Sequence, residues 1–252
     1  YIKPGPVKIA AEGWDIEALL IILRVIHEQY DDIPQELSLE MLAKVAVVLH
    51  YYGCRELMVA FTETWMKALD KDIAETYCRD LMLWVWVTWC FREPSKFRLS
   101  TAIAMSSSEG LIDGWGLPIP EKIIESMNED RHKFIEKQVS KVYSVFEDFT
   151  SGRHRGCSSE CQSRVIGTLT RYMKDMHILD PRPTAPYQGL NFKGLTNQIT
   201  SCKSPEWPNP MKKNTTFARY CENSCFLSDF GSLTKYIPGL DLPTLIKQGY
   251  HS

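Results

Sequence analysis

RDLMLWVWVTWCFREP, residues 79–94, holds the most apolar run of the chain, so the fold has to be built around it. Its middle, LMLWVWVTW, is large and apolar at every position except one threonine. A helix that is apolar all round is normally buried at the centre of a core, although the β-branched and aromatic content also permits a strand. The charged pairs that frame the run and its length favour a helix. We therefore predict a buried central helix over about 77–92, which Pro94 ends.

On the N-terminal side of this segment, apolar periodicity predicts three more helices. The first follows Asp15 as N-cap, and its apolar face holds Ile16, Leu19, Leu20, Leu23 and Ile26. The second follows Ser38 as N-cap and ends at Gly53. The third runs from about Arg55 to Leu69, with an inner face of Leu57, Phe61, Thr64, Trp65 and Ala68. A short strand is expected at 7–10.

On the C-terminal side the same reasoning predicts a mainly helical chain with proline-rich connections. Helices are expected over 95–105, 121–149, 163–176 and 191–202, and a short helical or turn-like segment near the end. Loops are expected at 110–120, 151–156, 181–186 and 204–216, of which the last is the best candidate for a mobile loop. The predicted fold class is mainly α, a bundle-like array with at most one or two short N-terminal strands.

Composition limits the classes of partner. The 252 residues fit one large domain or two small ones, and a net charge of -2 gives no electrostatic reason to expect nucleic acid or an anionic membrane. No apolar run approaches the roughly 20 residues that cross a bilayer. Cys54, Cys78 and Cys90 lie in apolar helical patterns and are interpreted as buried free thiols. They predict a reducing compartment, cytoplasm or nucleus.

Three phrases near the start of the chain resemble the second half of a BTB/POZ domain. They are VKIAAEGWDIEALLIILRVIH, SLEMLAKVAVVLHYYGC and RELMVAFTETW. The positions that match that family's pattern are Asp15, Ala18, Leu19, Leu42, Ala43, Tyr51 and Leu57. The spacing from Leu42-Ala43 to Tyr51 is one residue longer than the usual form. The resemblance implies a partial BTB/POZ-like domain over 1–72.

The rest of the chain, 73–252, resembles the helical C-terminal extension of a group of fungal BTB-type proteins. The phrases are RDLMLWVWVTWCFREP, GLPIPEKII, RGCSSECQSRVIGTLTRYM, PRPTAPYQGLNFKGL and GLDLPTL. The resemblance implies a non-enzymatic protein–protein interaction module, an adaptor or scaffold. Helices similar to 15–29 and 55–69 contact cullin-type ubiquitin ligase scaffolds in some relatives. BTB strands and helices that lie ahead of Val7 in that family, and that often form its dimer, are absent from this sequence.

Four cysteines form two close pairs, C-x3-C, and are the sharpest candidate for a metal site. They are Cys157, Cys161, Cys221 and Cys225, with His154 and Cys202 as substitutes. Zinc takes four such ligands in a tetrahedron, and close pairs preorganise half of the shell. A structural zinc ion would pin the proline-rich loop to the domain. C-x2-C is the stronger zinc signature, so free buried thiols and a disulfide remain alternatives.

Two rival functions are kept open beside the interaction module. A small-molecule enzyme would need a deep pocket with perturbed histidines or carboxylates, and the sequence carries no familiar catalytic motif. A DNA-linked regulator would use basic residues beside the cysteine pairs, at Arg153, Arg155, Lys212, Lys213 and Arg219. The interaction module itself predicts an apolar surface patch near one end of the BTB-like helices and no pocket of converging titratable groups. Trp115 and Trp207, in loops, are candidate exposed anchors.

Overall fold

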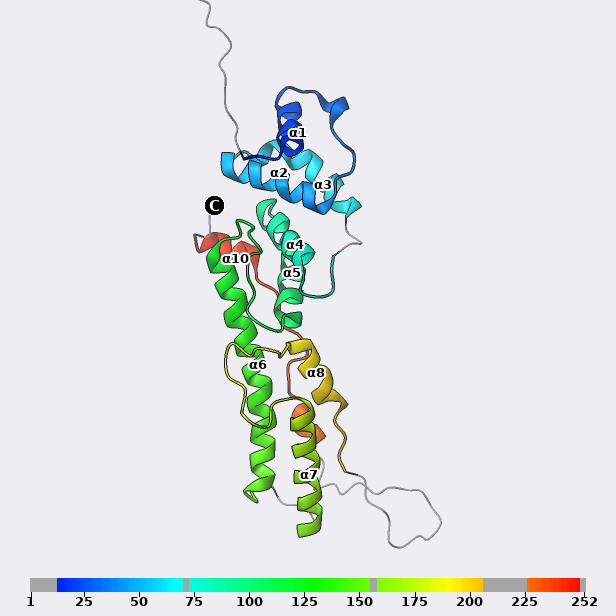
Figure 1. Ribbon diagram of the computed structural model, residues 1–252, viewed down its shortest axis with the longest axis vertical. Coiled ribbons are helices and arrows are strands. Elements are labelled where there is room, and N and C mark those ends of the chain that lie inside the picture. Colours follow the sequence, from blue (N-terminus) through cyan, green and yellow to red (C-terminus); the bar gives the residue numbers. More distant parts are fainter. Residues whose placement is uncertain (1–12, 70–72, 155–157, 206–225, 250–252) are drawn as a thin grey trace, which may run out of the picture. The chain divides into compact units, whose positions relative to one another are not determined.

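The computed structural model describes residues 13–69, 73–154, 158–205 and 226–249 (Figure 1). Within those ranges the chain forms helices and connecting turns and no strand, so the mainly α prediction is confirmed. The strand expected at 7–10 and most of the loop expected at 204–216 lie outside the described residues.

The chain divides into two compact units that alternate along the sequence. One unit comprises 1–101, 114–121 and 240–252, and the other comprises 102–113 and 122–239. This division differs from the boundary at 72/73 that the family resemblance implies. Residues 73–101 fall in the first unit because their fully apolar helix covers the core of the helices that precede it.

The first unit is built from short helices around one central helix (Figure 1). Its elements are α1 (Ile16–Ile26), the 3-10 turn η1 (Tyr30–Asp32), α2 (Leu39–Tyr52), the 3-10 turn η2 (Arg55–Met58), α3 (Val59–Ala68), α4 (Arg79–Cys90), the first part of α5 (Pro94–Ser107) and α10 (Leu242–Lys247). Pro94 is the first residue of α5, where its missing N–H costs nothing.

Helix α4 is the predicted central helix, and every residue from Leu81 to Cys90 is buried. It packs on the apolar face of α2, which buries Leu42, Ala43, Val45, Ala46, Val48 and Leu49. The indole Nε1 of Trp86 donates to the carbonyl of Ala43 at 3.2 Å, so a hydrogen bond joins α4 to α2 in addition to their apolar packing. The sequence prediction for this segment is confirmed.

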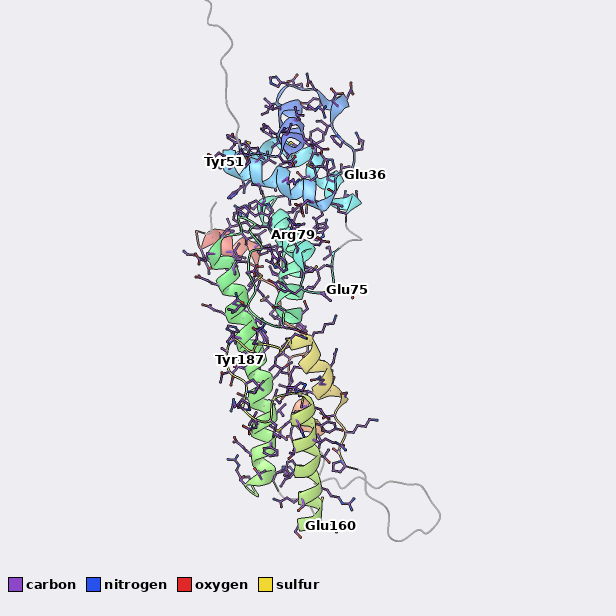
Figure 2. All side chains as sticks on the ribbon, viewed as in Figure 1. Glu36, Tyr51, Glu75, Arg79, Glu160 and Tyr187 are labelled. Atoms are coloured by element: carbon purple, nitrogen blue, oxygen red, sulfur yellow. The ribbon has the colours of Figure 1, made fainter. Side chains whose placement is uncertain are left out.

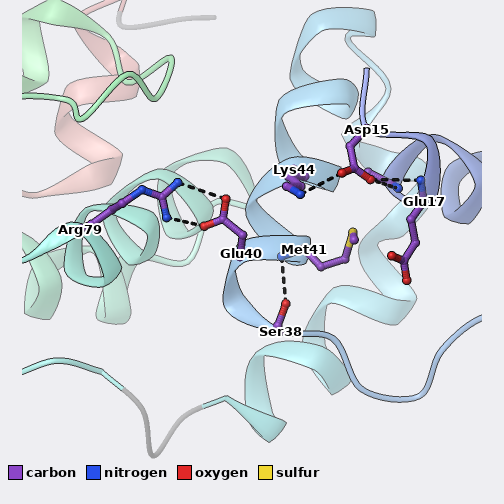
Figure 3. A network of polar contacts seen from close by, with 8 residues as sticks. Asp15, Glu17, Ser38, Glu40, Met41, Lys44 and Arg79 are labelled. Carbon is purple, nitrogen blue, oxygen red and sulfur yellow. Dashed lines mark hydrogen bonds and ion pairs between the residues drawn. The ribbon is translucent and has the colours of Figure 1, made fainter. Parts of the chain in front are cut away.

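Side-chain hydrogen bonds cap the N-termini of α1 and α2 and connect the first turn of α4 to that of α2 (Figure 3). Asp15 Oδ1 accepts from the backbone N–H of Glu17 and of Ala18, and Ser38 Oγ accepts from Met41, so both predicted N-caps are confirmed. Asp15 also pairs with Lys44 at 2.8 Å. The Arg79 guanidinium binds Glu40 through two hydrogen bonds, which sets the first turn of α4 against that of α2.

The third predicted helix is present, but it begins later than predicted and its predicted inner face is only partly right. Residues 55–58 form the 3-10 turn η2, and only then does α3 begin at Val59. The buried side chains follow regular α-helical spacing from the end of η2, displaced from most of the predicted face. Leu57, Thr64 and Ala68 of the predicted face are exposed, whereas Trp65 of that face is buried. The buried side chains are Met58, Thr62, Trp65 and Met66.

The second unit centres on a long helix, α6 (Glu121–Thr150), with α7 (Ser159–Asp175), α8 (Phe192–Ser201) and the short α9 (Leu227–Phe230). Helix α7 lies alongside α6: Gln162 Nε2 donates to the Phe149 carbonyl at 2.7 Å, and the Tyr143 hydroxyl donates to the Ile178 carbonyl at 2.6 Å (Figure 1). Helix α7 begins four residues before the predicted start at 163, because Ser158 is its N-cap.

Arg131, completely buried on α6, organises the connection between α7 and α8. Its guanidinium donates to the carbonyls of Pro186 and Leu190 at 2.7 Å, and to those of Ser108 and Tyr187 at 3.2 Å. Burial lowers the pKa of Arg131. One side chain thus supplies hydrogen-bond donors to four backbone carbonyls, which would otherwise lack these donors in the interior.

Candidate functional site

Helix α1 is apolar on two opposite faces, and only one of them is buried. Ala18, Ile21, Ile22 and Val25 are buried in the first unit. The other face carries Ile16, Leu20, Leu23 and Ile26, with 75%, 45%, 38% and 50% of each residue exposed. At about 100° per residue, Leu20 and Leu23 lie within roughly 40° of Ile16 and opposite the buried stripe. We call the four exposed side chains the α1 outer face.

The apolar stripe that helical spacing predicts on α1 is this outer face and not the inner one. Ile16, Leu20, Leu23 and Ile26 belong to the predicted stripe and are exposed, and Leu19 of the same stripe is half-buried. Periodicity identifies a real stripe on α1 but does not tell which of two stripes meets the core. An apolar surface patch is therefore observed among the helices that carry the BTB/POZ resemblance.

An aromatic cluster flanks the N-terminus of α1. Trp14 precedes the N-cap, and its ring centroid lies 4.9 Å from that of Tyr51 and 6.0 Å from that of Tyr52. Both tyrosines end α2 and are exposed; Tyr51 is labelled in Figure 2. Exposed tyrosine and tryptophan side chains are enriched where proteins dock, since each brings a large area with little loss of rotamer freedom.

A small pocket of about 180 Å³ lies where α2 and α4 end. It is lined by Leu49, His50, Gly53, Arg55, Glu56, Trp89, Cys90 and Arg92. His50 stands edge-on to Trp86 and Trp89, with ring centroids 5.2 and 5.3 Å away. Burial, and then the positive charges of Arg92 and Arg55, lower the pKa of His50. The pocket thus gathers titratable groups, contrary to the expectation for an interaction module, which predicts no such pocket.

The Arg55–Glu56 pair and the Cys90 thiol also line this pocket. Arg55 Nε pairs with Glu56 at 3.1 Å, and burial raises the pKa of the Cys90 thiol to about 12. The Cys90 thiol is therefore not an activated nucleophile at neutral pH. Among the described residues, no carboxylate or hydroxyl forms a hydrogen bond with His50, so the geometry supplies no general base paired with a nucleophile.

The candidate zinc ligands are mostly beyond the part of the chain that the structure describes. Cys157, Cys221 and Cys225 lie outside the described residues, whereas Cys161 is buried in the first turn of α7. Of the two substitutes, His154 is exposed beside Phe149, and Cys202 is buried at the end of α8. No cluster of His, Cys, Asp and Glu suited to a metal occurs within the described ranges. The four-cysteine site stays a prediction.

The remaining residues singled out in the sequence fall partly inside and partly outside the described ranges. Arg155, Lys212, Lys213, Arg219 and Trp207 lie outside them, and Arg153 pairs with Asp148 at 2.8 Å. Trp115 is 47% exposed, as expected of an anchor, and its Nε1 donates to the Tyr77 hydroxyl at 3.0 Å. Cys90 is buried as predicted, but Cys54 and Cys78 are only half-buried.

Within the described part of the chain, no helix is both long and apolar enough to cross a membrane. The functions of two arginines, Arg92 and the buried Arg131, were missed by sequence reasoning. Arg131 does fall at helical spacing between Met127 and Ile135, which is a signal of its burial, whereas no sequence pattern sets the half-buried Arg92 apart. Comparison of the chain with protein-family models, curated proteins and solved structures found no match.

Proposed function

We propose that this protein is a non-enzymatic protein–protein interaction module that docks its partner on the α1 outer face. The observation that carries the proposal is the doubly apolar character of α1. A helix at the surface of a monomer normally places polar residues opposite its buried stripe. Here that position holds Ile16, Leu20, Leu23 and Ile26, while the polar residues Glu17 and Arg24 are confined to one flank.

Energetics favour covering this face. Full burial of a leucine or isoleucine side chain contributes about 1.5–3 kcal/mol. The four side chains are already partly covered by their neighbours, so docking would gain roughly half of that for each. The aromatic cluster at Trp14 and Tyr51 adds area at one end. A face of four apolar side chains suits a partner that is held by a few central anchors surrounded by a polar rim.

A cullin-type ubiquitin ligase scaffold is the partner that the BTB/POZ resemblance implies. The helices similar to those that contact such scaffolds in some relatives are α1 and the η2–α3 segment. Exposed apolar residues occur on both, since Leu57 and Val59 are 43% and 64% exposed. The placement of exposed apolar side chains on these elements supports the proposal without identifying the partner.

The test is direct binding to a purified cullin-type scaffold, measured by calorimetry with the whole chain. A Leu20→Glu/Leu23→Glu variant puts two charges on the outer face and should weaken binding at least 100-fold. Because both residues point away from the core, its circular dichroism and melting temperature should stay near those of the unmodified chain. A matched control, Leu99→Glu, changes an exposed leucine of α5 (49% exposed) and should bind normally.

Absence of binding to the scaffold would remove the cullin partner alone. Partner capture from the native cell with the unmodified chain and the double variant then tests the wider proposal. Proteins retained by both baits equally would contradict docking on the α1 outer face, and turnover of a substrate by the isolated chain would contradict a non-enzymatic role.

A further inference from the structure

The pocket between the ends of α2 and α4 contains an arginine that lacks an acceptor among the described residues. Arg92 is half-buried, and its guanidinium carbon lies 5.2 Å from the ring centroid of Trp89. Its Nη1 is out of contact with solvent, and within the described residues it has no hydrogen-bond acceptor. An arginine carries five N–H donors, and buried donors are nearly always satisfied.

Several acceptors around the pocket are already bonded to other partners. The carboxylate of Glu56 lines the pocket but accepts from Arg55 Nε. The carbonyls at the end of α4 are taken by backbone donors, since Arg92 N–H donates to Trp89 and Glu93 N–H donates to Thr88 at 2.9 Å. The end of α2 is closed in the same way, with donors from Gly53 and Cys54. These are the paired bonds that end a helix with a left-handed residue.

The backbone at Arg92 is also unfavourable for its residue type. Its φ is 63°, a left-handed conformation that glycine adopts freely and other residues adopt at a cost. The equivalent position at the end of α2 is Gly53, with a φ of 62°. Glu28 and His177 hold this position on other helices, but both are exposed, whereas the Arg92 side chain turns into a pocket.

From these observations we infer that the pocket binds an oxyanion, a phosphate or carboxylate group, held by the Arg92 guanidinium with Arg55 and His50 at its edge. A planar guanidinium matches two oxygens of either group bidentately. The pocket volume of about 180 Å³ corresponds to roughly six waters at about 30 Å³ each, which is room for one such group. Gly53 leaves the α2 side open, because nothing lies within 4 Å of the position of an added Cβ.

The anion would change the electrostatics of the pocket in a predictable direction. Burial and the charge of Arg55 lower the pKa of Arg92, and a bound anion offsets both effects. The same anion offsets the repulsion that Arg92 and Arg55 exert on a protonated His50. His50 is thus an internal reporter: its pKa rises when the site is filled. This site uses other side chains than the α1 outer face, so its test is independent of the proposed docking.

The experiment titrates the whole chain with inorganic phosphate and, separately, with acetate, each against sodium chloride at equal ionic strength and pH 7. Binding is read by calorimetry and by the NMR titration of the His50 ring. We expect saturable binding of at least one anion, with an upward shift of the His50 pKa. Saturation by phosphate alone identifies a phosphate site, and saturation by both identifies a site for carboxylates as well.

Arg92 variants separate binding from folding. Arg92→Gly fits the left-handed backbone, so it should raise the melting temperature while it lowers anion affinity at least 10-fold. Arg92→Lys keeps the charge but loses the bidentate geometry, and its affinity should fall less. Arg153→Gln, an exposed arginine of the other unit, should bind normally. Responses to phosphate and acetate that match chloride, or an Arg92→Gly chain that binds as tightly as the unmodified one, would overturn the inference.

Discussion

Among single residues, Arg131 and Arg92 differ in whether the protein supplies acceptors for the guanidinium group. Arg131 is fully buried and bonds four carbonyls, so its charge is compensated by backbone dipoles. Arg92 is only half-buried, yet the described residues offer its Nη1 no acceptor. The first arrangement holds a fold together, whereas the second is suited to a ligand.

Replacing Arg131 with methionine should destabilise the protein by about 3–5 kcal/mol, because several buried carbonyls lose their donors at once. The free energy of unfolding from urea denaturation measures this. Lys133→Met, a change at an exposed position two residues along the same helix, should stay within about 0.5 kcal/mol. Equal losses in the two variants would show that the Arg131 bonds contribute nothing specific.

His50 should make stability depend on pH. Its pKa is lowered in the folded protein by burial and by Arg92 and Arg55, so the unfolded chain binds the proton more tightly. Its contribution is complete above the unfolded pKa of about 6.5 and is lost as pH falls through the folded value. The free energy of unfolding should therefore drop between pH 7 and pH 5.

His50→Gln should show a shallower drop over that window than the unmodified chain, as measured by urea denaturation at several pH values. His132, whose pKa burial also lowers, is present in both and cancels in the comparison. His27→Gln, at the exposed end of α1, is the matched control. A slope unchanged by His50→Gln but reduced by His27→Gln would contradict the assignment.

Among the helices, α4 and α1 are both strongly apolar, yet only α4 is buried all round. Helix α4 packs on α2 within the first unit, and each of its faces is covered. Helix α1 packs on α2 by one stripe and leaves the other exposed. The amount of apolar surface predicts that a helix packs, but neighbours decide how many of its faces are covered.

The tryptophans of α4 differ in one hydrogen bond, which a pair of substitutions can measure. Trp86 Nε1 donates to Ala43, whereas Trp84 Nε1 is buried without an acceptor among the described residues. Both changes to phenylalanine leave a similar gap. Trp86→Phe should cost about 1 kcal/mol more, because it also removes a satisfied donor, while Trp84→Phe removes an unsatisfied one. Chemical denaturation of the two variants gives the difference; a greater loss for Trp84→Phe would contradict the role given to the Trp86–Ala43 bond.

In the molecule as a whole, the two units are interleaved in the sequence. The first unit takes in 114–121 and the last residues of the chain, where Asp241 pairs with Arg98 and Leu240 N–H donates to Thr101 at 3.0 Å. Interleaving of this kind cannot be read from local periodicity, since it depends on contacts between residues that are far apart along the chain.

The predicted zinc site would depend on the whole chain, since its four predicted ligands come from two distant segments. If Cys157, Cys161, Cys221 and Cys225 bind the ion, elemental analysis of the purified chain should give about one zinc per molecule. Chelation should then lower the melting temperature, and Cys225→Ser should reduce the zinc content while Cys54→Ser leaves it unchanged. A metal-free preparation whose melting temperature ignores the chelator would rule the site out.

Local sequence was enough to predict the fold class, the central helix α4, the caps of α1 and α2, and the existence of an apolar stripe on α1. Each of these depends on local spacing or on one capping side chain, which act within a turn or two of backbone. Tertiary packing settled which stripe of α1 faces outward, which side chains of η2 and α3 are buried, and that Arg92 and Arg131 lie in such different surroundings. Those outcomes depend on which distant segments cover a residue, because burial and hydrogen-bond partners are set by packing and not by neighbours along the chain.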